Sequence, residues 1–404
     1  MNDPTETAKP KFPPRKKNAP TAVPPSLQFD LFTQFYGASA DLSNTIELWD
    51  AVPKFAVSKR RQDQIRDTNG RLPILRQSFL HRPFPRALNE PLSCSVKIVP
   101  AYIETDDGDR DFYPSTDEEL LDEVLRKIYS DQTLGMLDMT NGDSWVRFTL
   151  RGLQRELSLR GRTRSLAEIK RSLEILAHCV VTVHVSKGSR DLNISTAFLS
   201  DLTSVSRRDY EDGTTAWCAR LPALVTKSIR DLSFRQFNYA TLMSLDSQLA
   251  RWFHKRLSHE YVNAALMSPY TILYSTIARD SALLSDRPVD NRKAVTAALS
   301  GLKERGVLFC FDQSQRLDGR KITDVLYTLT PSRDFVAEIK AANKRAADGH
   351  ARAFADGLSG PWRNEHVRKA DRRHVHGQEL AAEGADDRRR QVAIQQHKKK
   401  DGME

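Results

Sequence analysis

The sequence predicts an α+β fold in which two similar units follow one another between a disordered N-terminal arm and a disordered basic C-terminal tail. Two observations predict the paired units. Helical periodicity is followed by a β-hairpin pattern at two places in the chain, and these places align at an offset of 126 residues. A third observation predicts the disordered ends, because residues outside 27–340 are biased toward Pro, Lys, Arg and Ala.

Length and composition limit the class of protein. The 404 residues contain 62 Lys and Arg against 52 Asp and Glu, a net charge of +10, and suffice for two or three domains. No apolar run is long enough to span a membrane, and the start of the chain has no apolar signal region, so we expect a cytoplasmic protein without a membrane partner. Four scattered cysteines fit neither a disulfide framework nor a zinc site: Cys94, Cys179, Cys218 and Cys310.

The positive charge is concentrated at the ends of the chain. Residues 1–26 contribute +3 and residues 341–404 contribute +4, which leaves +3 for the interval between them. A nucleic-acid surface would therefore depend on local clustering of basic residues. The expected organisation is an arm at 1–26, a linker at 27–90, a first domain at 91–235, a second at 236–340 and a tail at 341–404.

The first unit reads as three helices and a hairpin. Thr116 and Glu119 form a capping-box pattern before an amphipathic helix, and a strand from Trp145 to Leu150 leads into a short helix from Gly152 to Leu159. A second capping box opens the next helix and directs apolar residues inward. This box consists of Ser165 and Glu168, and the inward residues are Ile169, Leu173 and Leu176. A strand at 180–185, a turn at 187–190 and a strand at 192–199 follow this helix.

The second unit repeats this order. An apolar helix face from Leu245 to Tyr261 precedes a short helix near 271–278 and a longer helix from Pro288 to Arg305, with Gly306 just past its end. Strands at 307–311 and 322–329 flank an Asp318-Gly319 hairpin turn. The 126-residue offset pairs Ile169 with Val295, Leu173 with Leu299, Leu176 with Leu302, Val181 with Val307, Val183 with Phe309, and Val185 with Phe311. Although helix-to-strand junctions can resemble one another by chance, the shared order predicts two tandem winged helix-turn-helix domains.

A winged helix binds DNA by placing its recognition helix in the major groove and its hairpin on the neighbouring backbone. Basic residues occupy these positions. Residues 146–173 carry eight basic and two acidic side chains, and basic residues at a helix N-terminus oppose its dipole unless phosphates or bases are the partner. The alternative is a solvated Arg-rich face. The candidate DNA-binding residues are Arg151, Arg155, Arg160, Arg162, Arg164, Lys170, Arg171, Lys187 and Arg190 in the first unit, and Arg287, Asn291, Arg292, Lys293, Arg320 and Lys321 in the second.

An enzyme is not expected. The chain has no P-loop, GxGxxG, HExxH or GxSxG motif. His374-Val375-His376 matches a metal pair of rolling-circle nickases, but no tyrosine nucleophile follows it, and the acidic run at 104–111 reads as a solvated turn. We therefore expect no catalytic residue, no metal and no cofactor.

Two segments resemble a known family. Gln28-Phe29-Asp30-Leu31-Phe32 resembles the sliding-clamp-binding pentapeptide that plasmid initiators of the TrfA type carry before their winged helices, although Phe29 replaces the usual Leu. The stretch 242–251 resembles the helix that opens the second winged helix of TrfA and RepC-like initiators. The alternative for the pentapeptide is that its apolar residues begin an element packed on the first unit.

The resemblance implies a bacterial plasmid replication initiator. Such proteins bind double-stranded origin repeats (iterons), help melt an adjacent AT-rich region, and recruit host DnaA, DnaB helicase and the sliding clamp. Their monomers bind iterons, whereas their homodimers limit copy number. The alternatives are a winged-helix transcriptional regulator or autorepressor, for which a clamp motif has no use, and an interaction protein whose winged helices no longer bind DNA.

Overall fold

The computed structural model describes residues 41–355, except 84–89, 106–107, 131–133, 139–142, 188–189, 205–215 and 320. Side chains at 187, 190, 230 and 353–355 are also not described. The predicted arm, the clamp-like pentapeptide (Gln28, Phe29, Asp30, Leu31 and Phe32), Arg320, the histidine pair at 374–376 and the end of the tail lie outside the described residues.

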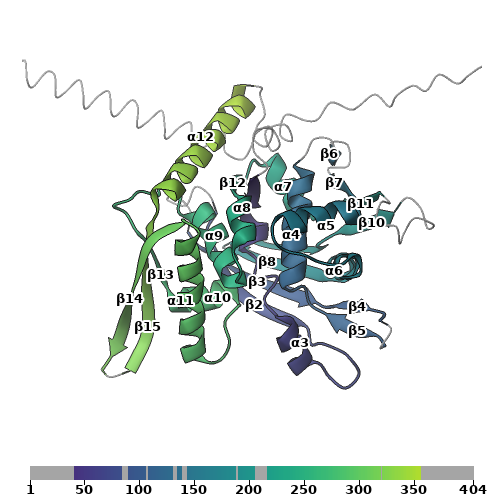
Figure 1. Cartoon of the computed structure of the whole chain (residues 1–404), viewed down its shortest axis with the longest axis horizontal. Coiled ribbons are helices and arrows are strands. Elements are labelled where there is room, and N and C mark those ends of the chain that lie inside the picture. Colours follow the sequence, from purple (N-terminus) through teal and green to yellow (C-terminus); the bar gives the residue numbers. More distant parts are fainter. Residues whose placement is uncertain are drawn as a thin grey trace, which may run out of the picture.

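The C-terminal unit is a winged helix-turn-helix domain (Figure 1). Its elements are α9 (Gln248–Glu260), β13 (Tyr270–Leu273), α10 (Tyr274–Ser281), α11 (Pro288–Glu304), β14 (Leu308–Asp318) and β15 (Lys321–Pro331). The three strands form an antiparallel sheet in the order β13-β15-β14. Fully buried Phe253, Leu299 and Tyr327 join the helices to this sheet in one core.

The N-terminal unit has the same order of helices and hairpin with additional strands. Its helix-turn-helix and wing are α4 (Thr116–Tyr129), α5 (Leu150–Leu159), α6 (Leu166–His178), β8 (Val180–Lys187) and β9 (Arg190–Ala197). The wing sheet is extended in the order β2-β3-β8-β9 by β2 (Leu75–His81) and β3 (Leu92–Val99). A second sheet, in the order β10-β11-β7-β6, contains β6 (Gly135–Asp138), β7 (Asp143–Phe148), β10 (Ser200–Ser204) and β11 (Trp217–Arg220).

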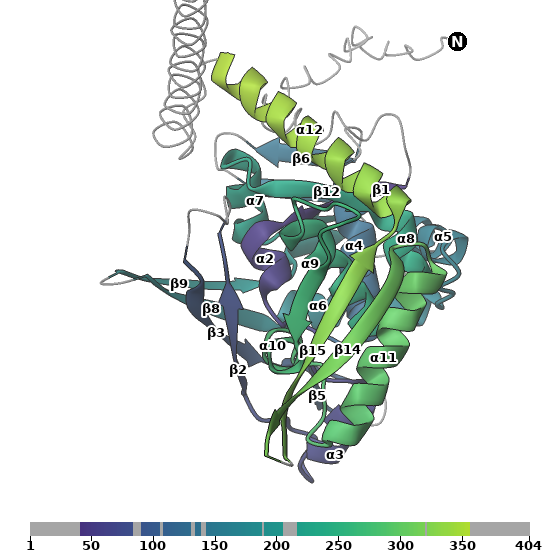
Figure 2. The ribbon, with the colours of Figure 1, turned by 90° about the vertical axis from the view of Figure 1, so that its left-hand side faces the viewer.

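Shorter elements complete the fold. The pair β1 (Leu42–Ile46) and β12 (Phe234–Asn238) and the pair β4 (Ala101–Ile103) and β5 (Arg110–Phe112) each form a two-stranded sheet. The remaining helices are α2 (Glu47–Ala51), α3 (Lys59–Ile65), α7 (Ala223–Arg230), α8 (Tyr239–Ser244) and α12 (Arg333–Ala355). The hairpins β8–β9 and β14–β15 project in different directions from the body (Figure 2).

The predicted helices are present, with shifts at their starts. Ser165 and Glu168 form the predicted capping box at α6. The box at α4 instead consists of Ser115 and Glu118, one residue earlier than Thr116 and Glu119, because Ser115 supplies the extended residue that precedes the first turn. Pro288 begins α11, and Gly306 takes a φ of +71° just after it, as the Pro-before, Gly-after pattern predicts.

Two terminal assignments need correction. Residues 27–90 were expected to be a linker, yet from Leu42 onward they supply elements of the first core, in which Ile46, Trp49 and Phe79 are at most 1% exposed. The tail was expected to start at residue 341, but α12 continues without a break to Ala355. In both places apolar residues bury against elements far away in sequence, which local composition does not reveal.

The match of buried positions at the 126-residue offset is present in the helices but is lost in the β14–β15 hairpin of the second unit. Ile169, Leu173, Leu176 and Val181 and their partners at the 126-residue offset are all buried. Phe309, the counterpart of buried Val183, is 71% exposed. The pairing of β14 with β15 shifts between Leu308 and Cys310, so Phe309 is the extra residue of a β-bulge and the side chains that follow change face.

A buried ion pair joins the two units. Arg251 on α9 is completely buried and donates from Nε and Nη2 to Glu119 Oε2 on α4, at 3.2 and 2.8 Å. Its Nη1 donates to the Leu245 carbonyl at 2.9 Å. Beside it, Gln248 donates to the Phe55 carbonyl at 2.8 Å. One guanidinium therefore fixes α9 against α4 and also holds the segment between α8 and α9.

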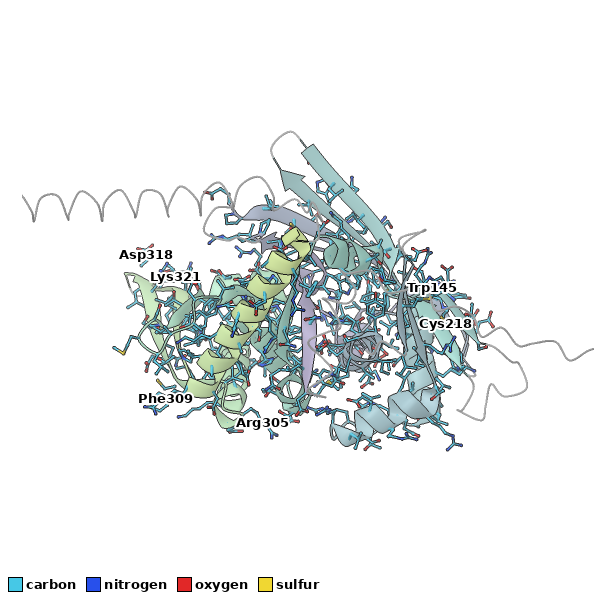
Figure 3. All side chains as sticks on the ribbon, turned by 90° about the horizontal axis from the view of Figure 1, so that it is seen from above. Trp145, Cys218, Arg305, Phe309, Asp318 and Lys321 are labelled. Carbon is cyan, nitrogen blue, oxygen red and sulfur yellow. The ribbon has the colours of Figure 1, made fainter. Side chains whose placement is uncertain are left out.

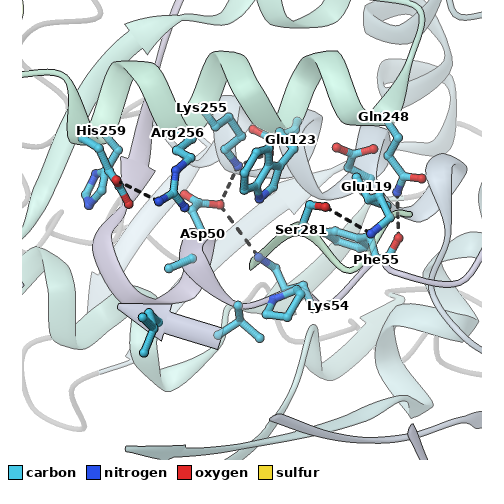
Figure 4. A pocket seen from close by; sticks show the side chains of 17 residues that line it. Asp50, Lys54, Phe55, Glu119, Glu123, Gln248, Lys255, Arg256, His259 and Ser281 are labelled. Atoms are coloured by element: carbon cyan, nitrogen blue, oxygen red, sulfur yellow. Dashed lines mark hydrogen bonds and ion pairs between the residues drawn. The ribbon is translucent and has the colours of Figure 1, made fainter. Parts of the chain in front are cut away.

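Further charges surround Asp50 at the same interface. Lys255 on α9 contacts both Asp50 and Glu123 at 2.5 Å, and Arg126 on α4 contacts Asp50 at 2.9 Å. A cavity of about 80 Å³ lies here, with Lys54 and Lys255 directed toward Asp50 (Figure 4). Burial alone would raise the pKa of Asp50, but the Arg126, Lys255 and Lys54 cations hold it well below its usual range. Burial lowers the pKa of Lys54 to about 8 against the attraction of Asp50.

We expect Arg251→Ala to lower the free energy of unfolding by about 3–5 kcal/mol, because it leaves the Glu119 carboxylate buried without its cation. Urea unfolding of the full chain measures this loss. Arg155→Ala, at an exposed position of α5, is the control and should change stability by less than about 0.5 kcal/mol. Equal stability of the two variants would show that the ion pair does not hold the units together.

Candidate nucleic-acid interface

The structure assigns the central arginines of the predicted basic cluster to contacts inside the protein. Arg160 pairs with Asp41 at 3.0 Å and with Glu156 at 3.2 Å, and its guanidinium lies over the Tyr239 ring. Arg164 donates from Nε to Asp117 on α4 at 2.9 Å. Burial would raise the pKa of Asp117, but hydrogen bonds from Lys59 and Arg164 lower it. Arg160 and Arg164 therefore have partners inside the protein that the sequence did not reveal, while their contact with DNA stays a prediction.

Arg162 joins the helix-turn-helix of the first unit to the start of the second. Its Nε donates to the Met243 carbonyl at 3.1 Å and its Nη2 to the Leu245 carbonyl at 2.6 Å. Its Nη1 also pairs with Asp246 at 3.1 Å, and its side chain is 17% exposed. A planar fork of donors suits two carbonyls at the end of a helix, which explains why an arginine stands here. Its role in DNA binding stays a prediction.

Asn291 is a structural residue of the second unit. It is 4% exposed, and its Oδ1 accepts from the Ser285 amide at 2.8 Å. Its Nδ2 donates to the Tyr274 hydroxyl at 2.8 Å and to the Ser285 carbonyl at 2.6 Å. With its amide occupied by the turn between α10 and α11, Asn291 has no donor left for an adenine edge, contrary to the prediction.

The other candidates in the first unit lie on several elements. Arg151 and Arg155 are exposed on α5, Arg171 is exposed on α6, and Lys170 is half-buried. Lys187 and Arg190 occupy the strand ends at the tip of the β8–β9 hairpin. The exposed first turn of α6 also carries Glu168, whose pKa is lowered by hydrogen bonds from the Ser165 backbone and hydroxyl. The first recognition helix is therefore less basic than its sequence neighbourhood indicates.

The second recognition helix presents an open surface at its N-terminal half. Arg287 and Lys293 are exposed, and Arg292 is half-buried. Ala294 and Ala297 are also exposed, so small side chains follow the cations along this side of α11. A helix surface of this kind can approach the floor of the major groove closely, and an alanine methyl can contact a thymine methyl.

The hairpin of the second unit extends this surface. Arg316 and Lys321 are exposed, with Lys321 and Asp318 at the end of the hairpin (Figure 3). The tip of the hairpin and the N-terminal end of α11 lie on the same side of the molecule (Figure 1). The surface that combines Arg287, Lys293, Arg316 and Lys321 is named the α11–wing face below.

Sequence reasoning missed a basic helix beside this face. α3 lies at the same end of the molecule as the N-terminal end of α11 (Figures 1 and 2), and its Arg60 and Arg61 are exposed. The signal was available as a Lys-Arg-Arg triplet directly after the N-cap residue Ser58. Its distance of more than 200 residues from α11 in the chain concealed its position.

Within the residues that the structure describes, no group of three or more His, Cys, Asp or Glu side chains could hold a metal ion. None of the helices described has both the length and the apolar character needed to cross a membrane.

Three solved structures resemble this chain at low identity. Selenomethionine derivatives of domain 2 and domain 3 of RctB match with a TM-score of 0.41 at 10% identity, over 71% of this chain and 98% of that one. A second structure of RctB domains 2–3 gives 0.37 at 11%, over 72% and 99%. The Pi initiator protein in complex with iteron DNA gives 0.33 at 11%, over 47% and 82%. No protein-family model and no curated protein matches the sequence.

We expect Arg162→Gln to lower stability by about 1.5–3 kcal/mol, the usual cost of losing charge-assisted hydrogen bonds, and to leave the salt dependence of DNA binding unchanged. Thermal unfolding and fluorescence anisotropy over a salt series measure the two effects on the same preparation. A stable variant whose salt slope has fallen by about 1 would return Arg162 to the DNA-binding surface.

Proposed function

We propose that this chain is a plasmid replication initiator that binds double-stranded origin repeats through two winged helices, with the second unit making the principal base contacts. The observation that carries the proposal is the α11–wing face. It combines exposed cations at the start of a recognition helix with exposed cations on the adjoining hairpin, as major-groove binding requires.

Each part of the face has a role in the proposal. Lys293, with Ala294 and Ala297 beside it, contacts base edges in the major groove, and Arg287 contacts the phosphates at its margin. Arg316 and Lys321 contact the backbone next to the helix. In the first unit, Arg151, Arg155 and Arg171 are the exposed arginines that contact phosphates in this proposal.

The initiator class rests on the sequence resemblance. The clamp-like pentapeptide supports recruitment of the host sliding clamp, and the resemblance extends this to DnaA, DnaB helicase, AT-rich single-stranded DNA and a monomer–homodimer equilibrium. Footprinting on DNA flanking the chain's own gene tests the class. Evenly spaced repeated protections support an initiator, whereas one operator-like protection indicates a transcriptional regulator instead.

We expect Lys293→Ala and Lys321→Ala to have different effects on DNA binding. Lys293→Ala should weaken binding to a duplex that the protein selects from a random library by about 1–3 kcal/mol and relax one position of the selected sequence. Lys321→Ala should weaken binding to every duplex and lower the salt slope by about 0.9. Anisotropy titrations and repeated selection measure both effects.

Lys303→Ala is the matched control, since Lys303 is exposed near the opposite end of the 17-residue helix, about 20 Å from the first turn. If both test variants behave like this control, α11 and the wing do not contact DNA.

We expect Leu31→Ala combined with Phe32→Ala to abolish pull-down of the bacterial sliding clamp, since adjacent apolar anchors dominate short linear motifs. Thermal stability and DNA binding should persist. If the melting temperature of the variant falls by several degrees and the parent protein never captures the clamp, these residues instead pack on the first unit.

A further inference from the structure

A groove separates α3 from the loop that leads into the second recognition helix. Its volume is about 810 Å³. Ser58, Arg60, Arg61 and Gln64 line one wall, and residues 282–287 with Asp290 line the other. Ile65, Leu75 and Leu283 are among its apolar lining residues. The groove therefore opens directly beside the first turn of α11.

The α3 wall is fixed in place by polar contacts behind the helix. Gln62 is 2% exposed, donates to the Val57 and Tyr113 carbonyls at 3.1 and 2.9 Å, and accepts from the Tyr113 amide at 3.0 Å. Arg66, just after the helix, donates to the Gly70 carbonyl at 2.9 Å. Ser58 caps the first turn by accepting from the Arg61 amide. A ligand that binds this wall meets a helix that is already ordered.

Of the three cations on α3, one forms an ion pair within the protein and two arginines face solvent. Lys59 forms an ion pair with Asp117. Arg60 and Arg61 are exposed and line the groove, and Arg61 contacts the Gln64 side chain at 3.4 Å. On the opposite wall, Arg287 is accompanied by Asp286 and Asp290. The positive potential is therefore strongest on the α3 side of the groove.

We propose that this groove holds the sugar–phosphate backbone of one strand of the duplex whose major groove receives α11, with Arg60 and Arg61 binding its phosphates. This inference rests on the proposed function. A recognition helix that enters the major groove by its N-terminal end brings the flanking backbone next to that end, which is where α3 stands. Guanidinium groups bind phosphate oxygens in a forked geometry that suits this contact.

The lining favours a duplex backbone over single-stranded DNA. Proteins that hold single strands stack the bases on aromatic side chains. The residues that line the groove include no aromatic side chain. Asp286 and Asp290 repel phosphates from the α11 wall, so the strand lies along α3. The N-terminal segment thereby becomes a third DNA-contacting element, outside both winged helices.

The test is Arg60→Gln combined with Arg61→Gln in the full chain. Anisotropy titrations over a salt series use the duplex selected by the parent protein and a scrambled duplex of equal length. We expect the salt slope to fall by about 1–2, binding to weaken to a similar degree for both duplexes, and the selected sequence to stay the same. Asp286→Asn should strengthen binding to both duplexes, because it removes a charge that opposes the phosphates.

Lys303→Gln combined with Arg305→Gln removes the same charge from the other end of α11 and should leave the slope at the parent value. A parent-like slope and affinity in the Arg60, Arg61 variant, with an unchanged melting temperature, overturns the inference while the proposed function stands. If the parent binds no duplex at all, the proposed function fails as well.

Discussion

The buried Arg251–Glu119 ion pair determines how the two winged helices stand relative to each other. It connects the first helix of one unit to the first helix of the other, and the Asp50 cluster beside it adds charges from α2, α4 and α9. Removing charges from water is costly unless each charge has an oppositely charged partner, so this interface is stable only when the paired side chains of the two units meet. The two units are therefore placed by electrostatic matching as well as by apolar packing.

This placement limits the ways in which DNA can be bound. The β8–β9 and β14–β15 hairpins point in different directions (Figure 2), so we expect the two wings to meet a bound duplex in different ways. α3 and the α11–wing face, by contrast, lie on one side of the molecule (Figure 1). In the proposed function α3 of the first unit thus supplements the second unit, and Arg162, Gln248 and Arg251 hold the two units together.

Sequence patterns were sufficient for the order of elements in both units. Capping boxes, the Pro288 and Gly306 signals and apolar periodicity report local geometry, and local geometry determines most of a helix-turn-helix. They could not reveal the contribution of residues 42–81 to the first core, because strands such as β1 pair with partners almost 200 residues away. The exposure of Phe309 was also beyond prediction, since it depends on a bulge in strand pairing.

The candidate site was harder to predict because an arginine serves DNA binding and interior ion pairing equally well. Clustering in sequence located Arg160, Arg162 and Arg164 correctly at the helix-turn-helix but could not show that Asp41, Asp246 and Asp117 lie within reach of them. The two roles differ in whether the fold places carbonyl or carboxylate acceptors within reach of the cation. Arg162 lies against two carbonyls at the end of α8, whereas Lys293 stands on an exposed helix surface beside two alanines. An arginine whose donors are taken by carbonyls and carboxylates of the fold has fewer donors left for phosphates, so the proposed DNA contact rests mainly on the exposed cations of α3, α11 and the wing.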